Sequence, residues 1–192
     1  MANHYNVLFV CTSNAARSII AEAILSRVGR EFFTAYSAGS HPAARVRPET
    51  VQQMELAQMG GEAYRTKSWE MFAWPGAPRM DFVITLCDVA AAHPMPKFAG
   101  NPVSLHWPVP DPEAADGSQE DVRLAFGAVF ESLNKRIRRM VALSLVAQGE
   151  EKLRKGLERM AKSVRRLADD ERMAGPGEPV DEALRSPFMI PA

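Results

Sequence analysis

A cysteine and an arginine flank a short polar loop in the segment VLFVCTSNAARSIIAEAIL, residues 7–25. Four apolar residues precede Cys11, and an apolar pattern of helical period follows Arg17. The cysteine is therefore expected at the end of a buried strand and the arginine at the start of a helix. A thiolate is a nucleophile, and a guanidinium binds tetrahedral oxyanions through two parallel hydrogen bonds. The pair could hold an oxyanion against a reactive sulfur.

The residues after the cysteine suit a loop that wraps around an anion. Backbone N–H groups in such a loop can converge, and the helix dipole adds positive potential. Asn14 can brace the loop, and Ser18 can donate a hydrogen bond to the sulfur. These surroundings are expected to lower the pKa of the Cys11 thiol, so that it is largely thiolate near neutral pH. The predicted oxyanion-binding residues are Thr12, Ser13, Asn14, Ala15, Ala16, Arg17 and Ser18.

The C-x5-R spacing has a second interpretation, a buried strand-end cysteine beside a surface arginine. The position between an apolar strand and an amphipathic helix, with small residues between, favours the site. Metal chemistry is not expected. The four histidines show no paired ligand spacing, and two cysteines cannot supply a closed zinc site.

Strand and helix patterns alternate along the chain. Strands are predicted at 5–10, 33–37, 81–86 and 103–107. Helices are predicted at 17–28, from Pro48 to the glycines at 60–61, near Ala90 and from about Asp121. This alternation predicts an α/β fold with a mostly parallel sheet covered on both faces. Ligands of such sheets lie outside the carboxyl ends of the strands, where Cys11 is expected.

Two further residues follow predicted strands at the same edge. Cys87 comes after DFVITL, and it is either a small buried hydrophobic residue or a second reactive thiol. Asp111 lies in a proline-stiffened loop, WPVPDP, after the fourth strand. A carboxyl group facing a bound oxyanion has a raised pKa, which suits a general acid, although Asp-Pro is also a common turn.

Beyond about residue 148 the composition changes. Five apolar residues recur at spacings of four and three, which predicts a helix with one apolar seam: Leu153, Leu157, Met160, Val164 and Leu167. The helix from Asp121 could continue into it, although Gly149 and Gly156 each cost about 1 kcal/mol relative to alanine. The apolar seam is expected to pack either on its own domain or on a second copy of the chain. The second case would be a homodimer through residues 150–170. The expected division is 1–147 for the main domain, 148–173 for the helical extension and 174–192 for a flexible tail.

The amino-acid composition limits the classes of protein to which this chain can belong. Hydrophobic residues make up 46% of the 192 positions and charged residues 24%, as in soluble globular proteins. Basic and acidic residues number 23 each, which gives no support for nucleic acid or an anionic membrane as partner. No apolar run is long enough to span a bilayer, and the N-terminus lacks a signal-like segment, so a cytoplasmic protein is expected.

The motifs together resemble the low-molecular-weight protein tyrosine phosphatase superfamily, and especially its arsenate reductase branch. The resemblance covers roughly residues 5–145 and includes YSAGSHPAARVRPETV, PMPKFAGNPVSLHWPVPDPE and AFGAVFESLNKRI besides the first segment. It implies a four-stranded parallel sheet flanked by helices. It also implies Cys11 as nucleophile, residues 12–17 as oxyanion loop, Ser18 as hydrogen-bond donor to the thiolate and Asp111 as general acid.

Two departures from the superfamily affect the expected activity. Phosphotyrosine-specific relatives usually have aromatic residues after the catalytic Asp-Pro, whereas this chain has DPEAADG. That difference argues for a small inorganic oxyanion. Thioredoxin-coupled arsenate reductases use three cysteines, and Cys87 matches the second. Met95 stands nearest to the place of the third, and a thioether cannot form a disulfide.

The expected activity is thiol-dependent arsenate reduction, with Cys11, Arg17, Asp111 and Cys87 as catalytic residues. No bound cofactor is expected. The partners are the oxyanion and an external thiol reductant, such as thioredoxin, glutaredoxin with glutathione or a small thiol, which could also take the role of Cys87. The alternatives are a phosphatase acting on phosphomonoesters and a phosphate-binding interaction protein without turnover.

Overall fold

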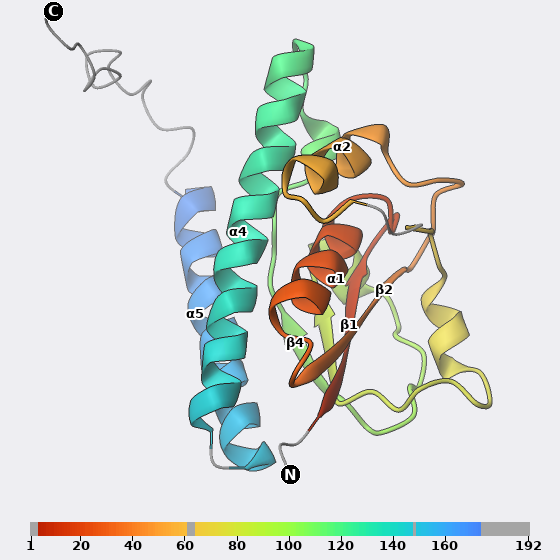
Figure 1. The fold of residues 1–192 in the computed structure, drawn as a ribbon, viewed down its shortest axis with the longest axis vertical. Coiled ribbons are helices and arrows are strands. Elements are labelled where there is room, and N and C mark those ends of the chain that lie inside the picture. Colours follow the sequence, from red (N-terminus) through yellow and green to blue (C-terminus); the bar gives the residue numbers. More distant parts are fainter. Residues whose placement is uncertain (1–3, 61–63, 148, 174–192) are drawn as a thin grey trace, which may run out of the picture.

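Four parallel strands form the centre of the molecule. The computed structural model describes residues 4–60, 64–147 and 149–173. The strands are β1 (Tyr5–Cys11), β2 (Phe33–Gly39), β3 (Phe82–Thr85) and β4 (Val103–His106), in the order β2-β1-β3-β4 (Figure 1). All three strand pairs are parallel. The predicted α/β fold with a four-stranded parallel sheet is confirmed.

Helices follow the strands as predicted. They are α1 (Arg17–Val28), α2 (Pro48–Leu56), α3 (Asp88–Ala92), α4 (Gln119–Val146) and α5 (Glu150–Met173), with 3-10 turns η1 (Trp69–Ala73) and η2 (Pro112–Ala114). α4 begins before the expected Asp121 because Ser118 caps it: the Ser118 hydroxyl accepts from the Asp121 N–H, and the Asp121 carboxylate accepts from the Ser118 N–H. α2 ends earlier than predicted, just before Gln58 takes a φ of 56°.

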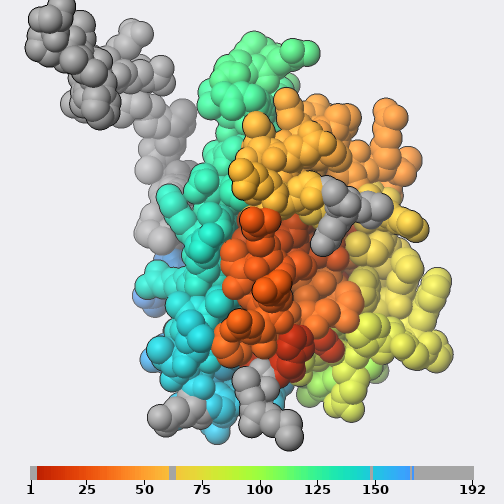
Figure 2. All heavy atoms as spheres, in the orientation of Figure 1, coloured from red at the N-terminus to blue at the C-terminus, as the bar shows by residue number. Residues whose placement is uncertain are grey.

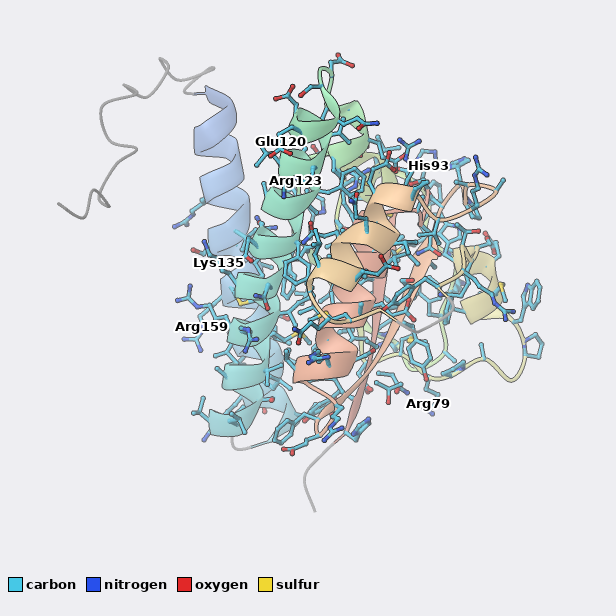
Figure 3. The ribbon with its side chains drawn as sticks, turned by 45° about the horizontal axis from the view of Figure 1, so that its top comes forward. Arg79, His93, Glu120, Arg123, Lys135 and Arg159 are labelled. Carbon is cyan, nitrogen blue, oxygen red and sulfur yellow. The ribbon has the colours of Figure 1, made fainter. Side chains whose placement is uncertain are left out.

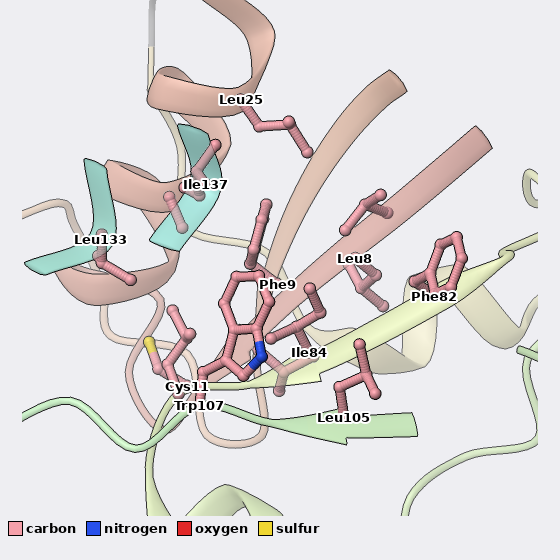
Figure 4. Packing of buried hydrophobic residues seen from close by; sticks show 14 of the residues in the cluster. Leu8, Phe9, Cys11, Leu25, Phe82, Ile84, Leu105, Trp107, Leu133 and Ile137 are labelled. Atoms are coloured by element: carbon pink, nitrogen blue, oxygen red, sulfur yellow. The ribbon is translucent and has the colours of Figure 1, made fainter. Parts of the chain in front are cut away.

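Alternate strand residues point to the two faces of the sheet and bury both. On one face, Phe9 contacts Trp107, and side chains of α1 and α4 surround the pair (Figure 4). On the other face, Tyr36 meets Phe72 of η1 edge to face at 5.7 Å. Cys11 lies at the end of this core and is fully buried.

α4 and α5 form an antiparallel hairpin at one side of the sheet (Figure 1). The chain leaves helical geometry after Val146, and Gly149 takes a φ of 103° that favours glycine. The helix therefore does not continue unbroken from α4 into the extension. Leu153, Leu157 and Met160 are buried against the body of the same chain, where α5 contacts β4 and α4. The side chain of Leu167 and the expected tail, 174–192, lie outside the described residues.

Charged side chains cover the outer faces of the hairpin. Figure 3 shows Lys135 on α4 and Arg159 on α5 directed away from the sheet. In Figure 2 the first turns of α4 stand beside α2, which α4 contacts. None of the helices in the described part of the chain is long and apolar enough to cross a membrane.

Candidate active site

The loop after β1 turns its carbonyl groups outward. Four of its carbonyl oxygens accept hydrogen bonds from N–H groups of the segment 40–50, which follows β2. The donor and acceptor residues are Ser40 and Cys11 (3.1 Å), His41 and Thr12 (2.9 Å), Ala43 and Ser13 (2.8 Å), and Arg47 and Ala15 (3.1 Å). Because a trans peptide unit directs its C=O and N–H oppositely, the N–H groups of these units point inward. The N–H of Asn14 shows this direction, since it donates to the Cys11 sulfur at 3.3 Å.

The inward N–H groups make residues 12–17 a concave ring of donors, the kind of site that binds anions. α1 begins at Arg17, and among the described residues no side chain caps its first turn. The first N–H groups of α1 therefore remain available to the same concavity. Arg17 is 5% exposed, so its guanidinium belongs to the interior of this site.

Gly39 allows the segment 40–50 to approach the loop. A Cβ atom at this position would lie 2.6 Å from the Thr12 carbonyl oxygen and 3.0 Å from the Asn14 nitrogen. Real Cβ atoms do not come so close to backbone oxygen. The glycine at the end of β2 is thus a condition for the hydrogen bonds that orient the loop.

Asn14 braces the loop, as predicted, and does so through its whole side chain. Its amide nitrogen donates to the hydroxyls of Ser18 (2.8 Å) and Ser37 (2.9 Å), and its amide oxygen accepts from the Lys67 N–H (2.7 Å). Its backbone has a φ of 49°, a left-handed conformation that asparagine tolerates better than most residues. Since Ser18 accepts from Asn14, its own hydroxyl proton is free to point at Cys11, 3.0 Å away.

Further hydrogen bonds connect the Asn14 contacts to an ion pair between Glu22 and Lys67. The Ser37 hydroxyl donates to the Glu22 carboxylate at 2.5 Å, and the Lys67 ammonium lies 3.4 Å from the same oxygen. Ser37 and Asn14 thereby link the ion pair of Glu22 and Lys67 to the oxyanion loop. Sequence reasoning missed Glu22, Ser37 and Lys67 because α1, β2 and a distant segment contribute one residue each, and no local spacing marks them.

The expected lowering of the Cys11 pKa is not found. Burial of the sulfur raises the pKa of the Cys11 thiol above its ordinary value. Hydrogen bonds with Ser18 and the N–H of Asn14 and the charge of Arg17 lower the pKa of this thiol, but less than burial raises it. The physical reason is the complete removal of the sulfur from water, which penalises a thiolate. Spacing in the sequence indicates which residues lie near a cysteine. It does not indicate how deeply the sulfur is buried.

Asp111 faces Arg17. The carboxylate Oδ2 lies 2.7 Å from the guanidinium Nη2, and its Oδ1 accepts from the N–H of Glu113 at 3.1 Å. The loop that carries Asp111 is anchored at its start, because the Val109 N–H donates to the Leu86 carbonyl at 3.0 Å. Arg136 of α4 donates to the Pro108 carbonyl at 2.9 Å. We call residues 108–114 the acid loop. It brings Asp111 to the arginine of the oxyanion loop, as the sequence predicted.

Glu113 also joins the acid loop to the oxyanion loop, and sequence reasoning missed it. Its carboxylate accepts a hydrogen bond from the Ser13 hydroxyl at 3.1 Å. Its other oxygen lies 4.0 Å from the Arg47 guanidinium, which also pairs with Glu49 at 3.3 Å. The only sequence signal was an acidic residue at a position where phosphotyrosine-specific relatives usually have an aromatic one.

Cys87 lies beside the first residue of the oxyanion loop. Its sulfur is 3.3 Å from the hydroxyl of Thr12, and the residue is 7% exposed. It immediately precedes α3, whose first residue, Asp88, pairs with His106 at 2.9 Å. The two cysteines are both free thiols at the same edge of the sheet. Met95 is partly buried against the core.

A buried cysteine, a ring of N–H groups and an arginine at the carboxyl edge of a parallel sheet define a cysteine-based, phosphatase-like protein. Over residues 6–159 the sequence matches the family described as low molecular weight phosphotyrosine protein phosphatase. The chain belongs to this family.

Curated relatives place the chain in the arsenate reductase branch of the superfamily. It is 30% identical over 134 residues to an arsenate reductase of Halalkalibacterium halodurans, which covers 69% of this chain and 91% of that protein. An arsenate reductase of Shouchella clausii is 28% identical over 133 residues, which covers 69% and 92%. The resemblance inferred from the sequence is therefore confirmed.

Solved structures agree with this assignment. An arsenate reductase in its phosphate-binding state is 25% identical and has a TM-score of 0.54, with 72% of this chain and 97% of that one covered. A low molecular weight phosphotyrosine phosphatase of Vibrio cholerae is 21% identical, with a TM-score of 0.53 and 68% and 92% covered. This second structure shares the fold.

Proposed function

We propose that the protein is a thiol-dependent arsenate reductase. One observation carries this proposal beyond a phosphatase: the Cys87 sulfur lies 3.3 Å from Thr12, the neighbour of Cys11. A phosphatase needs one nucleophilic sulfur, whereas reduction of arsenic(V) by thiols needs two. The similarity to curated arsenate reductases supports the same choice.

In the first step arsenate enters the oxyanion loop, where the N–H groups of residues 12–17 and the guanidinium of Arg17 bind its oxygens. The guanidinium of Arg17 then breaks its ion pair with Asp111 and binds the anion instead. The Cys11 sulfur attacks arsenic and forms a sulfur–arsenic bond, while one arsenic–oxygen bond breaks. The thiol proton and a proton from Asp111 or solvent leave with that oxygen as water. Hydrogen arsenate, a thiol and this second proton therefore give an arsenic(V) adduct of Cys11 and water. Ser18 stabilises the sulfur as it loses its proton.

In the second step the Cys87 sulfur attacks the Cys11 sulfur. A disulfide forms and the sulfur–arsenic bond breaks, and its electron pair remains on arsenic, which leaves as arsenite. The proton of the Cys87 thiol passes to the departing arsenite or to solvent. Arsenic is reduced by two electrons, and the two sulfurs are oxidised. Because Met95 cannot supply a third thiol, an external thiol reductant opens this disulfide directly. Thioredoxin and glutaredoxin with glutathione are the proposed sources, and both belong to a cytoplasmic setting.

Hydrolysis of phosphomonoesters is a second candidate function. The same loop, nucleophile and acid would form a phosphocysteine that water then hydrolyses, and the fold is shared with a phosphotyrosine phosphatase. The pairing of Asp111 with Arg17 at 2.7 Å favours neither function, because both use these two residues.

Arsenite release tests the proposal. The protein is given arsenate with thioredoxin and its reductase, with glutaredoxin and glutathione, or with a bare thiol. Cys11→Ser should release no arsenite under any condition. Cys87→Ser should stop with arsenic held on Cys11 if Cys87 resolves the adduct, and it should keep near-normal release with a small thiol if that thiol takes its role. Steady hydrolysis of an aryl phosphate without thiols, with no arsenite released, would establish the phosphatase instead. Inertness toward both anions would point to a binding protein.

A further inference from the structure

We propose that Glu113 is a specificity-determining residue that closes the mouth of the oxyanion pocket against phosphomonoesters and leaves it open to small inorganic oxyanions. This inference rests on the proposed function, because it assumes that residues 12–17 bind an oxyanion. It names the substrate class of that site and the side chain that selects it.

Two side-chain contacts fasten the acid loop to the oxyanion loop. One is the ion pair of Asp111 with Arg17 at 2.7 Å. The other is the hydrogen bond from Ser13 to Glu113 at 3.1 Å. Ser13 is the second residue of the oxyanion loop and Arg17 is its last, so the two contacts join the acid loop to both parts of the oxyanion loop. The second contact is formed by a residue that has no part in the chemistry.

The direction of the leaving group gives Glu113 its effect. Asp111 protonates the oxygen that departs, and that oxygen must therefore lie beside Asp111. When arsenate reacts, the departing group is a water molecule, which needs no further space. When a phosphomonoester reacts, the departing oxygen carries an organic group that must extend outward past the acid loop. It then meets the side chain of Glu113 where this side chain bridges to Ser13.

Arg47 lies near Glu113 and the oxyanion loop. Its guanidinium lies 4.0 Å from the second oxygen of Glu113, while its backbone N–H holds the Ala15 carbonyl of the oxyanion loop. An aryl group at the mouth would have to displace a carboxylate from Ser13 or remove it from water, and both cost free energy. The Glu113 carboxylate repels inorganic phosphate, arsenate and phosphomonoesters alike, because all of them are anions. Discrimination therefore comes from the organic group and not from charge alone.

Binding in a protein that cannot turn over separates these effects. In a Cys11→Ser background, calorimetry measures the affinities of inorganic phosphate and phenyl phosphate, and their ratio is compared among variants. Glu113→Ala opens the mouth and should shift the ratio toward phenyl phosphate about tenfold, the scale of a single pocket contact. Glu113→Gln keeps the size and the acceptor for Ser13, so its shift should be much smaller. Glu49→Gln is the matched control, because Glu49 pairs with the same arginine at 3.3 Å but has no contact with Ser13 among the described interactions.

The outcomes separate this inference from the proposed function. If phosphate binds normally and the ratio is the same in Glu113→Ala as in the parent, the role of Glu113 is overturned and the oxyanion site stands. If the parent binds neither ligand, the oxyanion site itself fails, and this inference fails with it. An equal shift in Glu49→Gln would assign the effect to the charge around Arg47 and overturn the closure. With Cys11 restored, Glu113→Ala should also raise kcat/KM for p-nitrophenyl phosphate.

Discussion

The sulfur of Cys11 is completely buried, and this determines how the protein responds to alkaline pH. Since the pKa of the Cys11 thiol is raised in the folded state, the unfolded chain loses this proton first. The stability that the protonated thiol provides is complete below the ordinary cysteine pKa of 9.0 and is lost as pH rises through the higher folded value. The free energy of unfolding should fall between these values by at most about 1.4 kcal/mol per pH unit from this group.

Urea unfolding from neutral to alkaline pH measures this effect. Cys11→Ser should have a smaller decrease over the same range, because serine does not titrate there. Cys87→Ser serves as the matched cysteine control. An identical decrease in the parent and Cys11→Ser would contradict the prediction.

The guanidinium of Arg17 is nearly inaccessible and pairs with Asp111, and in the proposed function it also binds the anion. Arg17→Lys keeps the charge but loses the planar pair of donors, so kcat/KM for arsenate should fall by about 10²-fold. Steady-state arsenite release measures this. Arg27→Lys is the control, since Arg27 lies at the far end of α1 and donates to the carbonyl of Gln58. Loss of activity in the control, or an unchanged rate in Arg17→Lys, would be inconsistent with the assigned role.

At the scale of elements, the end of β2 determines the shape of the oxyanion loop. Gly39→Ala places a Cβ 2.6 Å from the Thr12 carbonyl oxygen, so β2 or the loop must move. We expect a loss of about 1–3 kcal/mol in unfolding free energy, as for other overpacked sites, and weaker phosphate binding. Gly127→Ala, within α4, is the control: the nearest atom to its Cβ would be 3.9 Å away, and alanine favours the helix. Thermal unfolding and calorimetry distinguish the two, and equal behaviour would contradict the prediction.

The elements themselves were largely predictable because their patterns are local. Strand ends lie within two residues of the expected positions, since buried runs such as VLFV and FVIT are short and rich in β-branched or aromatic residues. α1 and α2 begin at the expected residues, whereas α4 begins two residues before the expected Asp121 because the Ser118 side chain caps it. The break between α4 and α5 depends on Gly149, whose weakening effect was foreseen but whose positive φ was not.

The candidate site was predictable only in its innermost part. Cys11, Arg17 and Ser18 are close in sequence, and Asp111 and Cys87 could be placed because strand ends share one edge. The residues that orient them come from separated segments, as Lys67 and Glu113 show. Their roles depend on tertiary distances that no spacing in the sequence encodes. The depth of Cys11 has the same origin, and for that reason the expected direction of its pKa was wrong.

At the scale of the whole molecule, α5 is part of the main body. Leu157 is fully buried against the chain's own residues, so Leu157→Ala should cost about 2–5 kcal/mol of unfolding free energy. Chemical unfolding measures the cost, and Leu145→Ala is the control because Leu145 is 65% exposed. Sedimentation of both variants addresses the homodimer through 150–170, which remains a prediction. If Leu157→Ala kept full stability and only lowered the sedimenting mass, the seam would belong to an interface between copies.

The position of β1 between β2 and β3 has a consequence for the timing of the chemistry. β1 and β3 are both paired on two sides. Such a strand exchanges its amide hydrogens only when much of the molecule opens, so Cys11, the last residue of β1, sits on a slowly exchanging strand. Cys87 precedes α3, a five-residue helix too short to persist by itself. We therefore expect α3 to open more readily than β1, which would move Cys87 and leave Cys11 in place. In the proposed cycle the immobile sulfur meets the oxyanion, and the sulfur on the readily opened segment is the one that can travel to it and then be exposed to the reductant.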